Sequence, residues 1–134
     1  WGEAPAEIVE WHALCLEVLR ASIAGARPGV TGKELHIAAC ERFEAAGHPT
    51  QRTKAPGSVL AEGFYHALGH GVGLDVHEDP SIGRTGAAFV AGDVLALEPG
   101  LYRPGFGGVR LEDTVLVTAD GAVTLASYDT DLEP

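Results

Sequence analysis

The chain has 134 residues, 46% of them hydrophobic and 21% charged, which fits one globular domain and excludes a disordered chain. Its 9 basic and 19 acidic residues give a formal net charge of −10 at pH 7, and such a surface repels the phosphates of nucleic acids. No apolar run reaches the roughly 20 residues of a membrane span, and no segment has the pattern of a signal peptide. The sequence therefore predicts a cytoplasmic protein with neither nucleic-acid nor membrane partners.

The ends and the thiols of the chain add two expectations. The sequence contains no methionine and begins with Trp1-Gly2, so we expect it to be part of a longer protein that continues before Trp1. Its two cysteines, Cys15 and Cys40, fall in predicted helices. Reduced thiols in the core are the simplest interpretation, and a disulfide scaffold is not expected.

Two amphipathic helices are predicted in the first third of the chain. The first begins after Pro5 with an acidic first turn and ends at Gly25. Its apolar residues recur at steps of three and four: Ile8, Trp11, Cys15, Val18 and Leu19. Thr31 and Glu34 have capping-box spacing at the start of the second helix, and Gly47 ends it.

The remainder of the chain has the pattern of a loop followed by strands. Residues 48–63 are polar and rich in proline and glycine, which is typical of a loop. Short apolar runs at 94–97, 109–117 and 122–125 predict strands, and Asp120-Gly121 predicts a hairpin turn between the last two. The expected fold class is α+β, with two helices followed by an antiparallel sheet.

Three histidines lie close together in the stretch 64–78: His66, His70 and His77. Imidazole is a common metal ligand and the usual proton carrier near neutral pH. The glycines around His70 leave room for a backbone, a metal ion or a substrate to approach. A glycine-rich turn with surface histidines is the alternative interpretation.

Two carboxylates belong to apolar runs that are predicted to be buried strands. Glu98 ends the run 94–97, and Glu112 lies within the run 109–117, two residues after Arg110. A buried carboxylate needs a partner, which can be a metal ion or the nearby arginine. Histidine with two glutamates suits Mn²⁺, Co²⁺, Zn²⁺ or Fe²⁺. The alternative is a structural ion pair between Arg110 and Glu112, or between a histidine and a glutamate.

Three motifs together carry a resemblance to a known family. The run from His66 to Glu78, the triplet at 98–100 and the stretch 107–114 resemble the metallopeptidases with the pita-bread fold, among them methionine aminopeptidases, aminopeptidase P, prolidase and creatinase. The resemblance extends over the whole chain and implies part of a pita-bread fold with a curved antiparallel sheet. The sequence Arg110-Leu111-Glu112 is most similar to the Xaa-Pro peptidases, which carry an arginine two residues before the last metal-binding glutamate.

The resemblance implies a metal centre. His70 and Glu98 would bind one of two divalent ions, and Glu112 would bridge both ions. Glu98 would also be catalytic, because it would help to deprotonate the attacking water. Mn²⁺ is the expected metal, with Co²⁺, Zn²⁺ and Fe²⁺ as alternatives. The implied reaction is hydrolysis of the peptide bond before a proline.

The resemblance also implies the residues that contact the substrate. His66 would line the substrate pocket, and His77 would bind the oxygen of the scissile bond, so both are expected to be catalytic as well as substrate-binding. Arg110 would hold Glu112 by charge-assisted hydrogen bonds and help to frame the proline-containing peptide.

The chain departs from the family pattern in one respect. The family has five metal ligands, and the two aspartates that come first in its sequences have no counterpart here. Residues 1–134 are therefore expected to be the C-terminal part of a catalytic domain whose N-terminal part is missing, inactive alone and partnered by that missing half. A homodimer is also expected. Alternative functions are a non-catalytic pita-bread module that binds peptides or proteins, and creatinase-like hydrolysis of a C–N bond.

Overall fold

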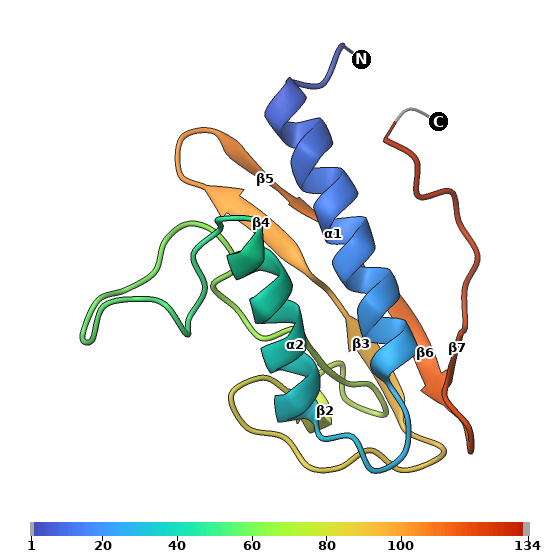
Figure 1. Cartoon of the computed structure of the whole chain (residues 1–134). Helices are drawn as coiled ribbons and strands as arrows, with labels where there is room; N and C mark the ends of the chain where they lie inside the picture. Colours follow the sequence, from blue (N-terminus) through green and yellow to red (C-terminus); the bar gives the residue numbers. More distant parts are fainter. Residues whose placement is uncertain (1, 133–134) are drawn as a thin grey trace.

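The computed structural model describes residues 2–132, in which two helices are followed by seven strands (Figure 1). The helices are α1 (Ala6–Gly25) and α2 (Gly32–Ala45). The strands are β1 (Gly69–Gly71), β2 (Glu78–Ile82), β3 (Val94–Leu97), β4 (Gly100–Arg103), β5 (Gly107–Arg110), β6 (Asp113–Val117) and β7 (Ala122–Thr124). The predicted α+β class is confirmed.

Both helices begin and end where the sequence predicts. Pro5 is the N-cap of α1. At α2 the Thr31 hydroxyl accepts from the Glu34 backbone N–H at 3.1 Å, and Glu34 accepts from the Thr31 N–H at 2.8 Å, which completes the predicted capping box. The backbone N–H and the hydroxyl of Thr31 both donate to the Glu34 carboxylate, and these hydrogen bonds lower its pKa. Neither helix is long and apolar enough to cross a bilayer within the described part of the chain.

The strands form two antiparallel sheets. The five-stranded sheet has the order β2-β1-β3-β6-β7, and β4 pairs with β5 in a separate two-stranded ladder. The β6–β7 hairpin turns through Asp120-Gly121, where the Thr118 N–H donates to the Gly121 carbonyl at 2.8 Å, as predicted. The pairs β1–β2, β4–β5 and β6–β7 join consecutive strands, whereas β1 pairs with β3 and β3 pairs with β6 across intervening strands.

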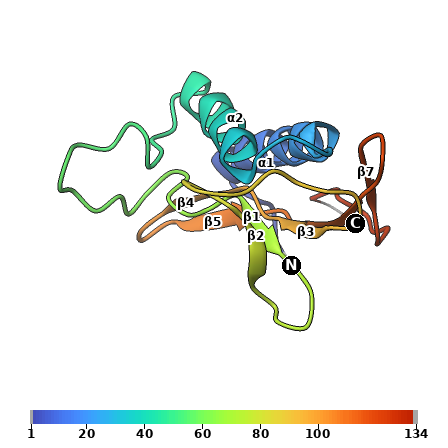
Figure 2. The same ribbon diagram turned by 90° about the horizontal axis from the view of Figure 1, so that it is seen from below.

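The helices cover one face of the sheet and leave the other face open (Figure 2). Helix α1 contacts β3, β4, β5 and β7, and α2 contacts α1 and β2. The core between the layers is apolar and includes Trp11, Cys15, Leu19, Phe43, Phe64, Leu97 and Val115. On the uncovered side, the loop between β1 and β2 projects away from the helices (Figure 2). The face of the sheet that packs against the helices therefore forms the core, and the face without helices can hold a functional site.

One strand prediction was wrong, and three strands were not predicted. The run 109–117 is predicted as one strand, yet it is divided into β5 and β6 at Leu111 and Glu112, because β5 pairs with β4 and β6 pairs with β3. Glu112 is consequently exposed at the break, not buried within a strand. Strands β1, β2 and β4 lie outside the predicted apolar runs, since they contain glycine, proline and charged residues.

Candidate metal centre

Strand β1 carries His70 between two glycines that the packing requires. A Cβ at Gly69 would overlap the carbonyl oxygen of Ala96 in β3, and a Cβ at Gly71 would overlap that of Asp79 in β2. Any larger residue would force β1 away from its neighbours. The two glycines therefore let β1 lie between β2 and β3, and this fixes where the imidazole of His70 stands.

Glu98 and Glu112 face each other across the β3–β6 and β4–β5 ladders. Leu97 pairs with Asp113 in the first ladder and Gly100 with Arg110 in the second. The pairing of the second ladder continues that of the first in the same register. Glu98 therefore lies opposite Glu112, between the two ladders. Cross-strand partners share a face of the sheet and side chains alternate along a strand, so both glutamates lie on the same face as His70.

His70 and Glu98 form a pair of metal-binding type. The Nε2 atom of His70 lies 3.7 Å from Oε1 of Glu98, and each side chain is 16% exposed. The Nδ1 atom lies 3.0 Å from the Gly71 carbonyl oxygen, which can only accept, so Nδ1 carries a proton and Nε2 is the nitrogen that faces the carboxylate. An imidazole nitrogen and a carboxylate oxygen are both ligands of divalent metal ions, so this pair fits a metal site.

An ion pair and two hydrogen bonds connect Glu98 to His66. Arg110 Nη1 lies 3.2 Å from Glu98 Oε2, and Arg110 Nε donates to the Tyr102 hydroxyl at 2.7 Å. That hydroxyl lies 3.1 Å from Nε2 of His66, whose Nδ1 lies 2.7 Å from the carbonyl oxygen of Ala67. Because the carbonyl fixes the proton on Nδ1, the hydroxyl donates to Nε2. Burial is the main cause that lowers the pKa of His66, which keeps the ring neutral in this chain.

The remaining predicted site residues lie at the edge of this cluster. The ring of His77 packs edge-on against that of His70, with 4.2 Å between centroids, although His77 sits in the exposed β1–β2 loop. Glu112 is exposed, and its backbone carbonyl accepts from the Tyr128 hydroxyl. Within residues 2–132 no three His, Cys, Asp or Glu side chains are close enough to hold a metal ion. The structure thus brings together two of the three predicted metal ligands, His70 and Glu98. The third, Glu112, lies opposite Glu98.

Arg110 makes a different contact from the one expected. The resemblance implies hydrogen bonds to Glu112, but among the described carboxylates it is Glu98 that lies within ion-pair distance of the guanidinium. Glu98 is the diagonal cross-strand neighbour of Arg110, and diagonal neighbours are within reach of long side chains. Arg110 therefore orients the carboxylate that faces His70.

Tyr102 is a site residue that the motifs do not include. It follows Glu98 by four residues and Gly100 by two, so strand alternation places it on the face of Glu98. That alternation is the signal that could have identified it. The two cysteines are buried in the helical part, as predicted, and take no part in the site.

The sequence is similar to a known family of metallopeptidases over most of its length. The model of metallopeptidase family M24 matches residues 1–119. The chain belongs to family M24. It is 38% identical to the Xaa-Pro dipeptidase of Pyrococcus furiosus over 92% of this chain and 32% of that relative. The chain thus spans about a third of the length of the curated relatives it matches.

Solved structures of M24 proteins have the same fold. The Pyrococcus furiosus prolidase superposes with a TM-score of 0.81 at 36% identity, covering 96% of this chain and 35% of that structure. The X-Pro aminopeptidase of Thermotoga maritima gives 0.81 at 33% identity, covering 97% and 34%. A methionine aminopeptidase of Thermotoga maritima gives 0.68 at 27% identity, covering 92% and 53%. The chain is therefore part of a pita-bread fold, as the sequence predicts.

Proposed function

We propose that the protein hydrolyses the peptide bond before a proline in a metal-dependent reaction. One observation carries the proposal: His66, Tyr102 and Arg110 are joined by hydrogen bonds, and Arg110 forms an ion pair with Glu98, beside His70. Membership of M24 and the names of the relatives, Xaa-Pro dipeptidase and X-Pro aminopeptidase, support the same reaction class.

The metal ions would be held by His70, Glu98 and Glu112. A nitrogen donor with two carboxylates suits Mn²⁺ first, then Co²⁺, Zn²⁺ or Fe²⁺. Two bound divalent ions acidify a water molecule and polarise the scissile carbonyl. The resemblance implies two further aspartate ligands, which we assign to a preceding half of the domain, so that residues 1–134 are its C-terminal part.

The chain's own residues would orient the peptide and move the proton. Arg110 fixes one oxygen of Glu98, which leaves Oε1 directed to His70 and able to take the proton of the attacking water. His77, beside His70, would donate to the oxygen of the scissile bond. Neutral His66, held by Tyr102 and Ala67, would form a wall of the pocket for proline. Arg110, on β5, would help to frame the peptide.

Two other functions remain as alternatives with distinct expectations. A non-catalytic module would bind peptides without turnover, and a creatinase-like enzyme would cleave a C–N bond without the metal pair. The joint presence of His66, His70, His77, Glu98 and Glu112 favours the peptidase, because a binding module has no use for this set. We also propose that the protein is a cytoplasmic homodimer, as we expect from the sequence.

The test is a comparison of Xaa-Pro and Met-Ala peptides with the intact protein loaded with Mn²⁺ or Co²⁺. We expect turnover of the Xaa-Pro peptides and little of Met-Ala. Preference for Met-Ala would overturn the substrate class, and binding without turnover would favour the module. The 134-residue chain alone should be inactive and hold at most one ion. Two tightly bound ions per monomer, by elemental analysis and light scattering, would contradict the need for a preceding half.

A further inference from the structure

The C-terminal tail, residues 125–132, runs back along the sheet after β7 toward the first turns of α1 (Figure 1). The ladder between β6 and β7 continues into the tail, because the Leu125 N–H donates to the Thr114 carbonyl at 2.8 Å, one step beyond the last pair of the ladder. Two further steps in the same register bring Ser127 opposite Glu112. The tail therefore passes beside the residue that is the expected bridging ligand.

The main-chain groups of Glu112 face the tail. In an antiparallel sheet, successive residues alternate in which neighbouring strand their hydrogen-bonding groups face. The Leu111 N–H donates to the Pro99 carbonyl at 3.2 Å, on the side of β3 and β4, whereas the Thr114 carbonyl accepts on the side of β7. Glu112 has the same parity as Thr114, so its N–H and carbonyl are directed to the tail. Within residues 2–132 neither group has a main-chain partner.

The hydroxyl of Tyr128 takes the place of the missing ladder hydrogen bond. It donates to the main-chain carbonyl of Glu112, which can only accept. Among the described residues this is the one hydrogen bond that holds the Glu112 main chain. A side chain of the tail thus fixes the chain at the interruption between the two ladders.

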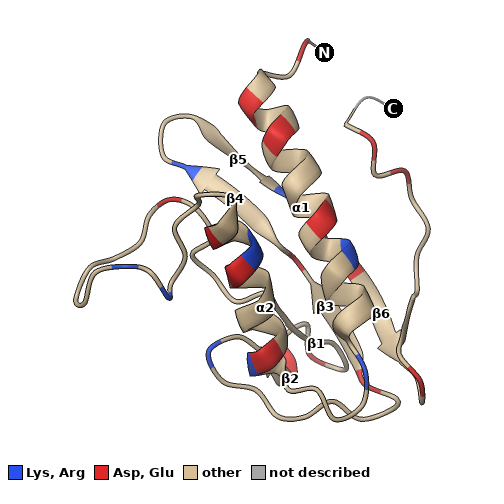
Figure 3. Ribbon diagram, in the orientation of Figure 1, with Lys and Arg blue, Asp and Glu red and all other residues tan. Residues whose placement is uncertain are grey.

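The rest of the tail gives the sheet no further hydrogen bond. Beyond the tyrosine the tail is acidic, with Asp129 and Asp131 (Figure 3). Residues 129–132, residues 108–111 and α1 line a groove of about 380 Å³, and no hydrogen bond joins the two segments in the described part of the chain. The tail carboxylates also form no group with Glu112 that could hold a metal ion within residues 2–132. The tail therefore reaches the site through one hydroxyl.

The carboxylate of Glu112 depends on this support of its main chain. Glu112 is exposed, and no ion pair of the described residues includes its side chain. A carboxylate with free side-chain torsions can reach two ions at once only from a fixed Cα. Groups that orient a metal ligand from behind change metal affinity or activity by about 10–100-fold.

We propose that Tyr128 is a positioning residue of the metal centre, which holds the main chain of Glu112 so that the carboxylate can bridge both ions. Tyr128 acts through Glu112 and touches neither the metal ions nor the peptide. The effect on turnover rests on the proposed function, whereas the effect on metal binding does not require peptidase activity. The competing role is purely structural: the hydroxyl would only attach the tail to the sheet.

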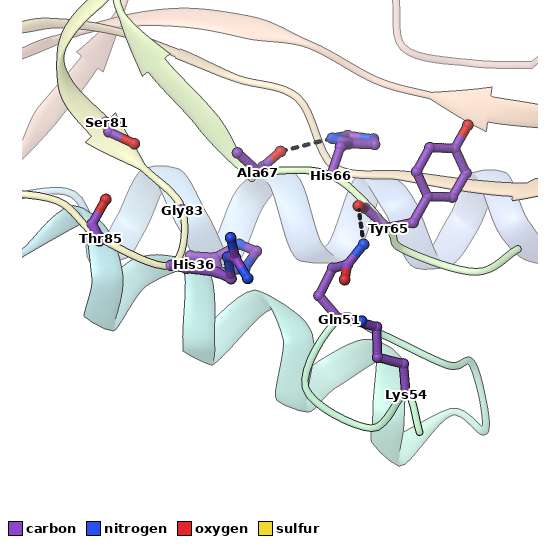
Figure 4. A pocket seen from close by; sticks show the side chains of 10 residues that line it. His36, Gln51, Lys54, Tyr65, His66, Ala67, Ser81, Gly83 and Thr85 are labelled. Atoms are coloured by element: carbon purple, nitrogen blue, oxygen red, sulfur yellow. Dashed lines mark hydrogen bonds between the residues drawn. The ribbon is translucent and has the colours of Figure 1, made fainter. Parts of the chain in front are cut away.

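The cavity beside His66 provides an internal comparison. Figure 4 shows its lining, which comes from α2, the loop at 51–54, residues 65–67 and the segment 81–85. No residue of the tail belongs to it. Loss of the Tyr128 hydroxyl should therefore lower kcat and leave KM for Xaa-Pro peptides unchanged.

The test uses Tyr128→Phe in the intact protein, with Mn²⁺ titrated by calorimetry and turnover of an Xaa-Pro peptide measured separately. We expect Mn²⁺ affinity to fall by about tenfold or more and kcat by about 10–100-fold. Because the Tyr128 side chain is 47% exposed, the melting temperature should not change. Tyr128→Leu, which removes the ring as well, should weaken Mn²⁺ binding to the same extent.

The matched control is Ser127→Ala, which removes a neighbouring exposed hydroxyl and should behave as wild type. Wild-type Mn²⁺ affinity in Tyr128→Phe, with or without a lower melting temperature, would leave only the structural role and overturn the proposal. A loss in Tyr128→Leu alone would do the same, since packing of the ring would then be responsible. Weaker Mn²⁺ binding without any turnover, even by the wild type, would overturn the peptidase and keep the positioning role. Turnover that is unaffected by Tyr128→Phe would do the reverse.

Discussion

Glu98 and Glu112 stand opposite each other at the point where two antiparallel ladders of common register meet. The interruption between these two ladders leaves Glu112 outside a strand and exposed, while Glu98 is held by Arg110 and faces His70. One carboxylate is thus fixed and the other is free to turn. A metal ion bound at His70 and Glu98 would draw Glu112 toward it by charge.

The first prediction concerns Glu112→Gln in the intact, metal-loaded protein. The amide keeps the shape but loses the anion, so activity should be abolished and divalent-ion binding should weaken. Substitution of a residue that hydrogen-bonds to a metal ligand lowers metal affinity or activity by about 10–100-fold, and loss of a bridging ligand should have a larger effect. Because Glu112 is exposed, thermal stability should change by less than about 0.5 kcal/mol. Calorimetric metal titration, peptidase assay and thermal melts check this, with exposed Glu10→Gln as control. Unchanged metal stoichiometry and turnover would reject the bridging role.

The second prediction concerns the hydroxyl of Tyr102. Tyr102→Phe removes the donor to His66 and the acceptor of Arg110 but keeps the ring that packs on Tyr65 at 5.0 Å. We expect kcat/KM for Xaa-Pro peptides to fall by about 10–100-fold, since groups that orient metal ligands have effects of this size. Metal stoichiometry and melting temperature should not change. Separate measurement of kcat and KM distinguishes lost orientation of Glu98 from lost proline binding, and wild-type values for both would exclude Tyr102 from the site.

The sequence predicts the helices well because their signals are local. The capping box at Thr31 and the apolar stripe around Trp11 depend only on neighbours three and four residues away, and both are present in the structure. Strand β1 is different, since Gly69 and Gly71 carry no side chain whose pattern could reveal a strand. Their role depends on Ala96 and Asp79, which arrive from other parts of the chain.

The same distinction applies to the site. His70, Glu98 and Arg110 are identified from motif residues, and the structure brings them together. Tyr102 is not identified from the sequence, because its role depends on two hydrogen bonds to residues 36 and 8 positions away. The division between β5 and β6 is also not predicted, because the apolar alternation of 109–117 is unbroken although the partner strand changes.

The third prediction concerns the thiols. Burial raises the pKa of Cys15 to about 12 and that of Cys40 to about 11, and both side chains are fully buried. Only the thiolate reacts with disulfide reagents, so the native protein should be inert to Ellman's reagent at pH 8, and both thiols should react in denaturant. Ser58→Cys places a third thiol in an exposed loop and should react within seconds. Rapid labelling of the native wild type would contradict the core assignment.

The last prediction concerns Phe64, which joins the core to the site. Its fully buried ring lies 4.9 Å from that of Phe43, 5.6 Å from that of His36 and 5.0 Å from that of His66. Phe64→Ala should reduce the free energy of unfolding by about 3–5 kcal/mol, because it leaves a cavity that the surrounding rings cannot fill. Val59→Ala, at a side chain that is 92% exposed, should change it by less than about 0.5 kcal/mol.

Urea unfolding of both variants and the wild type measures this difference. His66 and His36 both rest on the ring of Phe64, so the variant should also bind Xaa-Pro peptides less tightly at temperatures where it remains folded. Phe64→Leu keeps most of the volume and should recover most of the stability, but not the aromatic contacts with the two histidines. A loss of stability below about 1 kcal/mol for Phe64→Ala would show that this ring does not couple the core to the candidate site.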